Sequence, residues 1–187
     1  MQVHVPGKIM LSGEYAVLYG GTAVLVPVPR YLTVTAVEEP DLDNTTPVIS
    51  EALKQPIPEI HSQEKDLPTL HVNVDRSEFL YAGPDGIEHK LGLGGSAAEA
   101  VAIIALRFER CGFDWTTIPK KIHTYADQAH RRAQGGLGSG ADVAVIAYRQ
   151  PIRFRREGDQ SLVDVIEKPA SHLIPKLTLL WTGEPAN

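Results

Sequence analysis

The segment that most constrains the fold is KLGLGGSAAEA at residues 90–100, where three glycines stand directly before a long apolar run. Glycine lets the backbone turn closely around a neighbouring group. The run that follows, AEAVAIIALRFERCG, is rich in helix formers and reaches Gly112, which favours a helix end there. A glycine loop that leads into a helix presents unpaired N–H groups and the positive end of the helix dipole. The segment therefore predicts an anion site, most often for phosphate, at a helix that begins near Ser96.

Two other interpretations of this segment stay open. A glycine-rich turn before a helix can be only a tight connection. The spacing of Gly92, Gly94 and Ala97 also fits the dinucleotide-binding pattern G-x-G-x-x-A, which follows a buried apolar strand. The residues before Gly92 are YAGPDGIEHK, which are polar and typical of turns, so this context argues against a dinucleotide site.

Composition and charge exclude several classes of protein. The chain has 187 residues, 43% of them hydrophobic, which is enough for one domain with a core or for a domain and part of another. Its net charge of -5 argues against a nucleic-acid partner. Cys111 is the only cysteine, and its place on the apolar helix predicts a buried structural thiol. Since there is no signal-peptide pattern and no apolar run near the roughly 20 residues of a membrane span, we expect a soluble, cytoplasmic protein without a membrane partner.

The order of the segments predicts an α+β fold. Apolar and β-branched residues in QVHV, KIMLSGEYAVLY and TAVLVPVPRYLTVTAVE predict a β-rich start over residues 3–37. Next come a turn, a short helix in ISEALKQ, a surface loop in PIPEIHSQEKDLP and a strand in TLHVNV. A second helix is predicted over residues 116–133, then a helix or strand pair after QGGLGSGADVAV, then a strand in LIPKLTLLWTG. No repeat or linker divides the chain. The strand before WTGEPAN predicts that the chain continues into another subdomain.

Three glycine segments each carry a polar residue suited to phosphate chemistry: PGKIMLSGEYAVLYGG, KLGLGGSAAEA and QGGLGSGADVAV. Lys8 offers a point charge for an anionic or hydroxyl substrate, or is a solvated lysine at a strand edge. Ser96 can bind Mg²⁺ or phosphate through its hydroxyl, or is a helix N-cap. Asp142 can accept a proton from a substrate hydroxyl or hold a metal, or is the cap of a following helix.

Together the three segments resemble the GHMP kinases, the superfamily named for galactokinase, homoserine kinase, mevalonate kinase and phosphomevalonate kinase. Residues 92–98 read GLGGSAA where the family has GLGSSAA, and GSGADVAV is similar to the segment that carries the catalytic aspartate. The resemblance implies an α+β fold like domain two of ribosomal protein S5. It also implies an N-terminal, ATP-binding domain over residues 1–187 that ends before the C-terminal domain of the family.

Within the superfamily the chain is most similar to phosphomevalonate kinase, in GEYAVL, KLGLG, QGGLGSGADVA and the late WTG. Mevalonate kinases usually have GEH where this chain has Gly13-Glu14-Tyr15. The resemblance implies phosphoryl transfer from ATP, with Mg²⁺, to phosphomevalonate in isoprenoid precursor synthesis. A mevalonate or sugar kinase of the same superfamily stays open, as does a half-domain without catalysis that binds a nucleotide, a second chain or a missing C-terminal domain.

The resemblance also implies roles for particular residues. Asp142 and Lys8 would be catalytic, and Ser96 would lie near Mg²⁺. The ATP phosphates would meet Gly92, Leu93, Gly94, Gly95, Ser96 and Ala97. The acceptor would meet Lys8, Glu14, Tyr15, His130, Arg131 and Ser139, and Arg132 is a further candidate for its phosphate.

Three departures from the family pattern limit these roles. Gly95 replaces the first serine of the usual pair. Arg131, eleven residues before Asp142, stands where mevalonate kinases have a magnesium-binding glutamate, so the second metal ligand is unassigned. The glycine-rich third motif of the C-terminal domain is absent, so we expect little turnover from these 187 residues alone.

Overall fold

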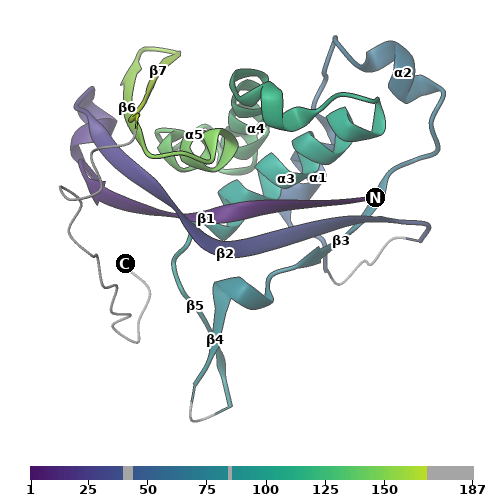
Figure 1. The fold of residues 1–187 in the computed structure, drawn as a ribbon, viewed down its shortest axis with the longest axis horizontal. Helices are drawn as coiled ribbons and strands as arrows, with labels where there is room; N and C mark the ends of the chain where they lie inside the picture. Colours follow the sequence, from purple (N-terminus) through teal and green to yellow (C-terminus); the bar gives the residue numbers. More distant parts are fainter. Residues whose placement is uncertain (40–43, 84–85, 168–187) are drawn as a thin grey trace.

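The fold is built on two long strands. The computed structural model describes residues 1–39, 44–83 and 86–167. Strand β1 (Gln2–Ser12) runs antiparallel to β2 (Ala23–Val37), and the two cross the molecule side by side in Figure 1. In β1 the buried Val3 and Val5 alternate with exposed polar residues, so one face of the ribbon is apolar and the other is polar. The predicted β-rich start is confirmed for these two strands.

Strand β2 is the centre of a five-stranded sheet. Along one edge β2 pairs with β1. Along the other edge its beginning pairs with β6 (Ile152–Glu157) and its end pairs with β3 (His71–Asp75), the strand predicted from TLHVNV. Strand β7 (Gln160–Val165) extends the sheet as a hairpin partner of β6. Every pairing is antiparallel, which confirms an α+β fold.

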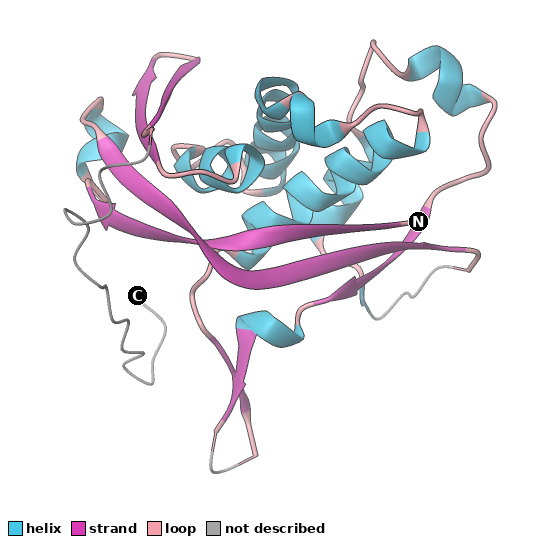
Figure 2. Ribbon diagram, in the orientation of Figure 1, coloured by secondary structure: helices cyan, strands magenta, loops and turns pink. Residues whose placement is uncertain are grey.

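Figure 2 shows the α-helices gathered on one side of the sheet. Helices α3 (Gly95–Arg110) and α5 (Ala141–Tyr148) pack on β1 and β2, and α1 (Pro47–Lys54) and α4 (Pro119–Ala133) pack against α3. Helix α3 is buried without a break over residues 97–108, because it has the sheet on one side and helices on the others. The largest fully buried side chains come from both layers: Leu25, Leu32, Ile49, Ile60, Ile103, Ile104, Leu106, Phe108, Ile122, Ile146, Ile152 and Phe154.

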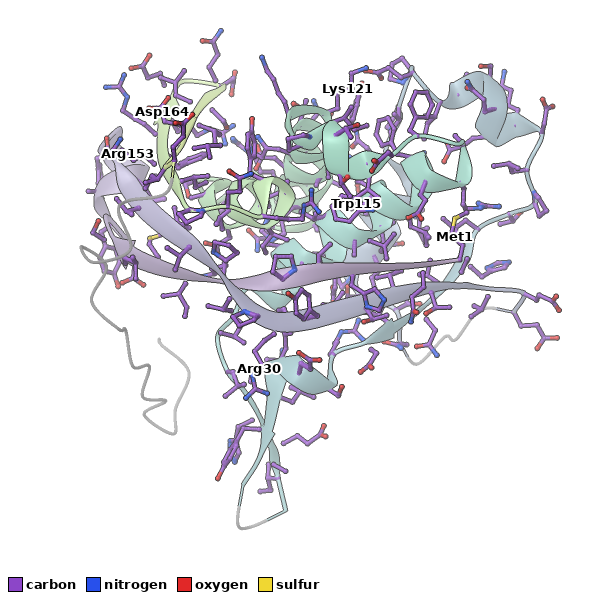
Figure 3. All side chains as sticks on the ribbon, viewed as in Figure 1. Met1, Arg30, Trp115, Lys121, Arg153 and Asp164 are labelled. Carbon is purple, nitrogen blue, oxygen red and sulfur yellow. The ribbon has the colours of Figure 1, made fainter. Side chains whose placement is uncertain are left out.

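A small hairpin stands on the opposite side of the sheet. It consists of β4 (Leu80–Ala82) and β5 (Glu88–Lys90), and the single turn η3 (Ser77–Phe79) leads into it. In Figure 3 Arg30 lies on this side of the ribbon and Trp115 lies on the helical side. The chain leaves β5 through Leu91, whose N–H donates to the Phe79 carbonyl at 3.0 Å. The hairpin thus fixes where the glycine loop starts.

Two segments differ from the sequence-based prediction. The residues AVLY form a 3-10 turn, η1 (Ala16–Tyr19), and not a strand, because Gly13 and Gly20 turn the chain with left-handed φ values of 86° and 80°. The predicted surface loop after α1 contains the short helix α2 (His61–Lys65), and Ile57 and Ile60 from this segment are buried in the core.

The ends of two helices also differ from the prediction. The predicted second helix starts as a 3-10 turn, η4 (Trp115–Thr117), before α4 begins at Pro119. Cys111 lies just beyond the end of α3 and is only partly buried, and this burial raises the pKa of its thiol. The strand predicted in LIPKLTLLWTG lies outside the described residues. None of the helices in the described ranges is long and apolar enough to cross a membrane.

Candidate active site

The glycine loop ends at an open helix N-terminus. Gly92 and Gly94 have φ values of 74° and 82°, and Gly94 is the N-cap of α3. The first backbone bond of the helix runs from the Ala98 N–H to the Gly94 carbonyl, at 2.9 Å. The N–H groups of the first turn before Ala98 therefore have no acceptor within the helix and face outward at its positive end. The predicted loop-to-helix geometry is confirmed, and phosphate binding there stays a prediction.

Lys8 lies across this loop. Its backbone N–H donates to the Leu93 carbonyl at 3.0 Å, and its side chain runs over Gly94. A Cβ atom on Gly94 would lie 2.9 Å from both Cγ and Cε of Lys8, so the absence of a side chain at Gly94 makes room for the lysine. Only 15% of the Lys8 side chain is exposed, so it is not a solvated lysine at a strand edge.

The ammonium group of Lys8 ends at Asp142. Its Nζ lies 3.1 Å from Asp142 Oδ2, and 36% of the aspartate side chain is exposed to solvent. Asp142 is the second residue of α5, whose N-cap is Gly140 without a side-chain capping bond. The interpretation of Asp142 as a helix cap is therefore wrong. The structure brings one residue from each glycine segment into contact: Lys8, the Gly94 backbone and Asp142.

Two residues that the sequence analysis did not identify, Arg156 and Asp127, hold the third glycine segment in place. Arg156 of β6 donates to the Ser139 carbonyl at 2.8 Å and pairs with Asp127 Oδ2 of α4 at 3.3 Å. Asp127 in turn lies against Gly140, where a Cβ atom would overlap its carboxylate. Both side chains lie far from Asp142 in sequence, and no local pattern marks them. They fix the turn that presents Asp142.

A buried histidine connects the second and third glycine segments. Ser96 Oγ lies 3.1 Å from Nε2 of His130, and the Gln134 side-chain amide nitrogen lies 3.2 Å from the same atom. Ser96 is thus not the N-cap. Only 8% of His130 is exposed, and desolvation by this burial lowers the pKa of its imidazole, against the opposing effect of nearby carboxylates.

Other predicted substrate residues lie apart from this centre. Tyr15 is 69% exposed in the turn before η1, and no described residue forms a hydrogen bond or ion pair with the side chain of Tyr15 or Glu14. The Ser139 hydroxyl accepts from the Ala141 N–H at 3.3 Å. Among the predicted phosphate-loop residues, Ala97 is buried and therefore offers only its backbone.

The two arginines of α4 also lie apart from Asp142. Arg132 pairs with Glu51 at 2.9 Å. Arg131 donates to the Gly136 carbonyl at 3.3 Å, and its other terminal nitrogen is buried without a partner among the described residues. Both line a groove of about 1260 Å³ between α4 and the β6–β7 hairpin. Neither contacts the Lys8–Asp142 pair, so their predicted contact with an acceptor phosphate is not supported by the arrangement.

The segment that contains the glycine loop and Asp142 matches a known family. A family model described as the N-terminal domain of GHMP kinases matches residues 63–150. This stretch holds the second and third glycine segments, His130 and Asp142. Residues 63–150 are thus similar to the N-terminal domain of GHMP kinases. No curated protein matches the sequence.

Solved structures share the fold of this chain. A Lin0012 protein from Listeria innocua has a TM-score of 0.70 at 22% identity, over 90% of this chain and 57% of its own. The Methanococcus jannaschii mevalonate kinase has a TM-score of 0.65 at 17% identity, over 90% of this chain and 56% of its own. A Streptococcus pneumoniae phosphomevalonate kinase in complex with phosphomevalonate and AMPPNP has a TM-score of 0.59 at 18% identity, over 83% of this chain and 49% of its own. The chain thus spans between 49% and 57% of the length of these solved chains.

The described part of the chain offers few protein ligands for Mg²⁺ at this site. Ser96 supplies a hydroxyl at the start of α3, and Asp142 supplies a partly exposed carboxylate. Glu99 is held by Arg76 at 2.7 Å, and Asp127 is held by Arg156. Within the described ranges no three or more His, Cys, Asp or Glu side chains gather as a metal site. This donor set fits an ion that is held mainly by phosphates and water, with one or two protein oxygens.

Proposed function

We propose that this chain forms the nucleotide-binding part of an ATP-dependent small-molecule kinase, with phosphomevalonate as its acceptor. The observation that carries the proposal is the contact of Lys8 Nζ with Asp142 Oδ2, at 3.1 Å, beside the open N-terminus of α3. A cation, a carboxylate and a helix N-terminus at one place are the groups that phosphoryl transfer needs, because its catalysis is mostly positioning and stabilisation of charge.

In this proposal the glycine loop binds the ATP phosphates. Gly92 and Gly94 allow the backbone to approach closely, and the free N–H groups of the first turn of α3, beginning at Gly95, donate to phosphate oxygens. The Ser96 hydroxyl would hold Mg²⁺, which when bound neutralises charge on the ATP phosphates.

Asp142 and Lys8 act on the acceptor. With phosphomevalonate as the acceptor, an oxygen of its phosphate group forms a bond to the γ-phosphorus while the bond from that phosphorus to the β-phosphate oxygen of the leaving ADP breaks. Asp142 orients this oxygen and accepts the proton of its monoprotonated form as the new bond forms, and with mevalonate or a sugar the same carboxylate would accept the hydroxyl proton. Lys8, whose side chain lies against Gly94 of the loop and beside the carboxylate, stabilises the negative charge that is shared between donor and acceptor oxygens.

The acceptor assignment rests on the sequence segments that are similar to phosphomevalonate kinase, above all GEYAVL and QGGLGSGADVA. The fold likeness to the pneumococcal enzyme that was solved with phosphomevalonate agrees with it. Mevalonate is the second candidate, because the M. jannaschii mevalonate kinase has the higher TM-score, 0.65 against 0.59.

The test is an ADP-release assay of the full polypeptide that contains this chain, with ATP, Mg²⁺ and one acceptor at a time. Phosphomevalonate, mevalonate and several sugars are compared by kcat/KM, and Asp142→Asn controls for background ATP hydrolysis. We expect phosphomevalonate to be preferred by at least about tenfold, which corresponds to 1.4 kcal/mol of transition-state binding. A preference for mevalonate or a sugar would overturn the acceptor only. ATP binding without turnover of any acceptor would favour a non-catalytic nucleotide-binding half-domain.

A further inference from the structure

His130 lies between the second and third glycine segments. It contacts one residue at the start of α3 and one at the end of α4. Its Nε2 lies 3.1 Å from Ser96 Oγ at the start of α3 and 3.2 Å from the amide nitrogen of Gln134 at the end of α4. We propose that His130 is a positioning residue: it accepts the proton of the Ser96 hydroxyl in a hydrogen bond and so directs the lone pairs of that oxygen toward the nucleotide. This inference rests on the proposed kinase function and deepens it.

The direction of the hydrogen bond follows from the second neighbour. An amide nitrogen can only donate, and the amide nitrogen of Gln134 faces Nε2. A neutral imidazole has one acceptor nitrogen and one N–H, so Nε2 is the acceptor and Nδ1 carries the proton. The Ser96 hydroxyl then donates to Nε2 and shares the Nε2 lone pair with the Gln134 amide in a three-centre hydrogen bond, and the two lone pairs of the hydroxyl oxygen remain free for a cation or for a phosphate-bound group.

The contacts of Nε2 favour a neutral ring. Both groups within hydrogen-bond distance of Nε2, the Gln134 amide nitrogen and the Ser96 hydroxyl, can donate to it. The carboxylates of Asp142, Asp127 and Glu99 each have a cationic partner of their own: Lys8, Arg156 and Arg76. A neutral imidazole with Nε2 as the acceptor is therefore the state that fits these contacts.

Gln134 extends the contact to the third glycine segment. Its side-chain oxygen lies 3.2 Å from the position that a Cβ atom on Gly138 would take, and Gly138 has a φ of 97°. The amide thus has one end on His130 and the other against the turn that precedes Asp142.

The first test measures the protonation state and tautomer of His130 in the ligand-free protein. Ring ¹⁵N NMR near pH 7 should show a neutral His130 with its proton on Nδ1, and Ser96→Ala should shift the Nε2 resonance. A proton on Nε2, or a resonance that is indifferent to Ser96→Ala, would overturn the proposal. This measurement needs no nucleotide. It therefore tests the hydrogen bond between Ser96 and His130 even if the proposed kinase function is wrong.

The second test is a double-mutant cycle on Mg-ATP affinity, measured by calorimetry on the full polypeptide that contains this chain. His130→Leu should weaken binding about fivefold to tenfold, as expected for one lost hydrogen bond. His130→Gln, which keeps an acceptor near the place of Nε2, should recover affinity to within about twofold of the wild type. In the Ser96→Ala background His130→Leu should add nothing, since contacting residues are not additive.

The matched control is His61→Leu, which removes an exposed histidine of α2 and should leave the affinity unchanged. Additive effects of His130→Leu and Ser96→Ala, or no recovery by His130→Gln, would show a merely structural role and overturn the proposal. Wild-type protein that binds no Mg-ATP would instead overturn the proposed function, while the NMR result still decides the role of His130.

Discussion

Gly94 is the position where one added carbon atom tests the site most cleanly. In Gly94→Ala the new Cβ would lie 2.9 Å from Cγ and Cε of Lys8, well inside an ordinary contact. The lysine must move, and its 15% exposed side chain has little free space on the loop side. We expect the 3.1 Å contact with Asp142 to break.

The matched variant is Gly92→Ala in the same loop. Gly92 has a φ of 74°, close to the 82° of Gly94, but a Cβ atom there meets nothing within 4 Å. The left-handed backbone costs each alanine about 1–2 kcal/mol. For a chain of this size that lowers Tm by about 2–8 °C in both variants. Only Gly94→Ala displaces Lys8, so only this variant should lose a further factor of about 10² in kcat, as for removal of one charge-stabilising donor.

The assay is kcat of the full polypeptide that contains this chain, at saturating ATP and acceptor, together with Tm of each variant. In a Lys8→Met background Gly94→Ala should cost no further activity, because the displaced group is already gone. Equal losses of kcat in Gly92→Ala and Gly94→Ala would refute the reasoning. A loss of kcat by Gly94→Ala that is also found in the Lys8→Met background would refute it as well.

Three further predictions concern stability and the extent of the active unit. Arg107→Met should lower the unfolding free energy by about 3 kcal/mol in chemical denaturation, because it leaves Glu64 and the carbonyls of Ala52 and Gln55 without their buried guanidinium. His123 has its pKa lowered from 6.5 to about 4 by desolvation. As the pH falls, His123 is therefore protonated in the unfolded state before it is protonated in the folded state. The free energy of unfolding should fall as pH drops from 6.5 toward 4, by up to about 1.4 kcal/mol per pH unit. In His123→Gln the free energy of unfolding should depend less on pH over this range. The 187 residues alone should turn over at least about 100-fold more slowly than the full polypeptide, since phosphoryl transfer needs water excluded, and comparable rates would contradict this.

The sequence was sufficient for the parts of the fold that depend on local pattern. The alternation around Val3 and Val5 identifies β1, and the apolar run after Gly95 identifies α3, because in each the spacing of apolar residues matches one buried surface. The three glycine segments could also be linked to one site, since close backbone approach needs glycine wherever it occurs along the chain.

The rest depends on contacts that no local pattern encodes. The residues AVLY look like a strand, yet the turns at Gly13 and Gly20 make them a 3-10 turn. Asp127 and Arg156 brace the Asp142 turn from 29 residues apart, and the contact of Ser96 with His130 spans 34 residues. His130 was expected from the sequence to meet the acceptor, and in the structure it is buried and contacts Ser96 and Gln134, which no local pattern indicates.

The most direct measurement of the central claim is the activity of Asp142→Asn in the full polypeptide that contains this chain. Asparagine keeps the size and removes the charge that faces Lys8 at 3.1 Å. Loss of a positioned base should lower kcat by about 10² to 10⁴, while ATP affinity, set by the glycine loop, and Tm stay nearly unchanged. Activity that survives within a few-fold would show that Asp142 is not the catalytic carboxylate, and the proposed mechanism would be wrong.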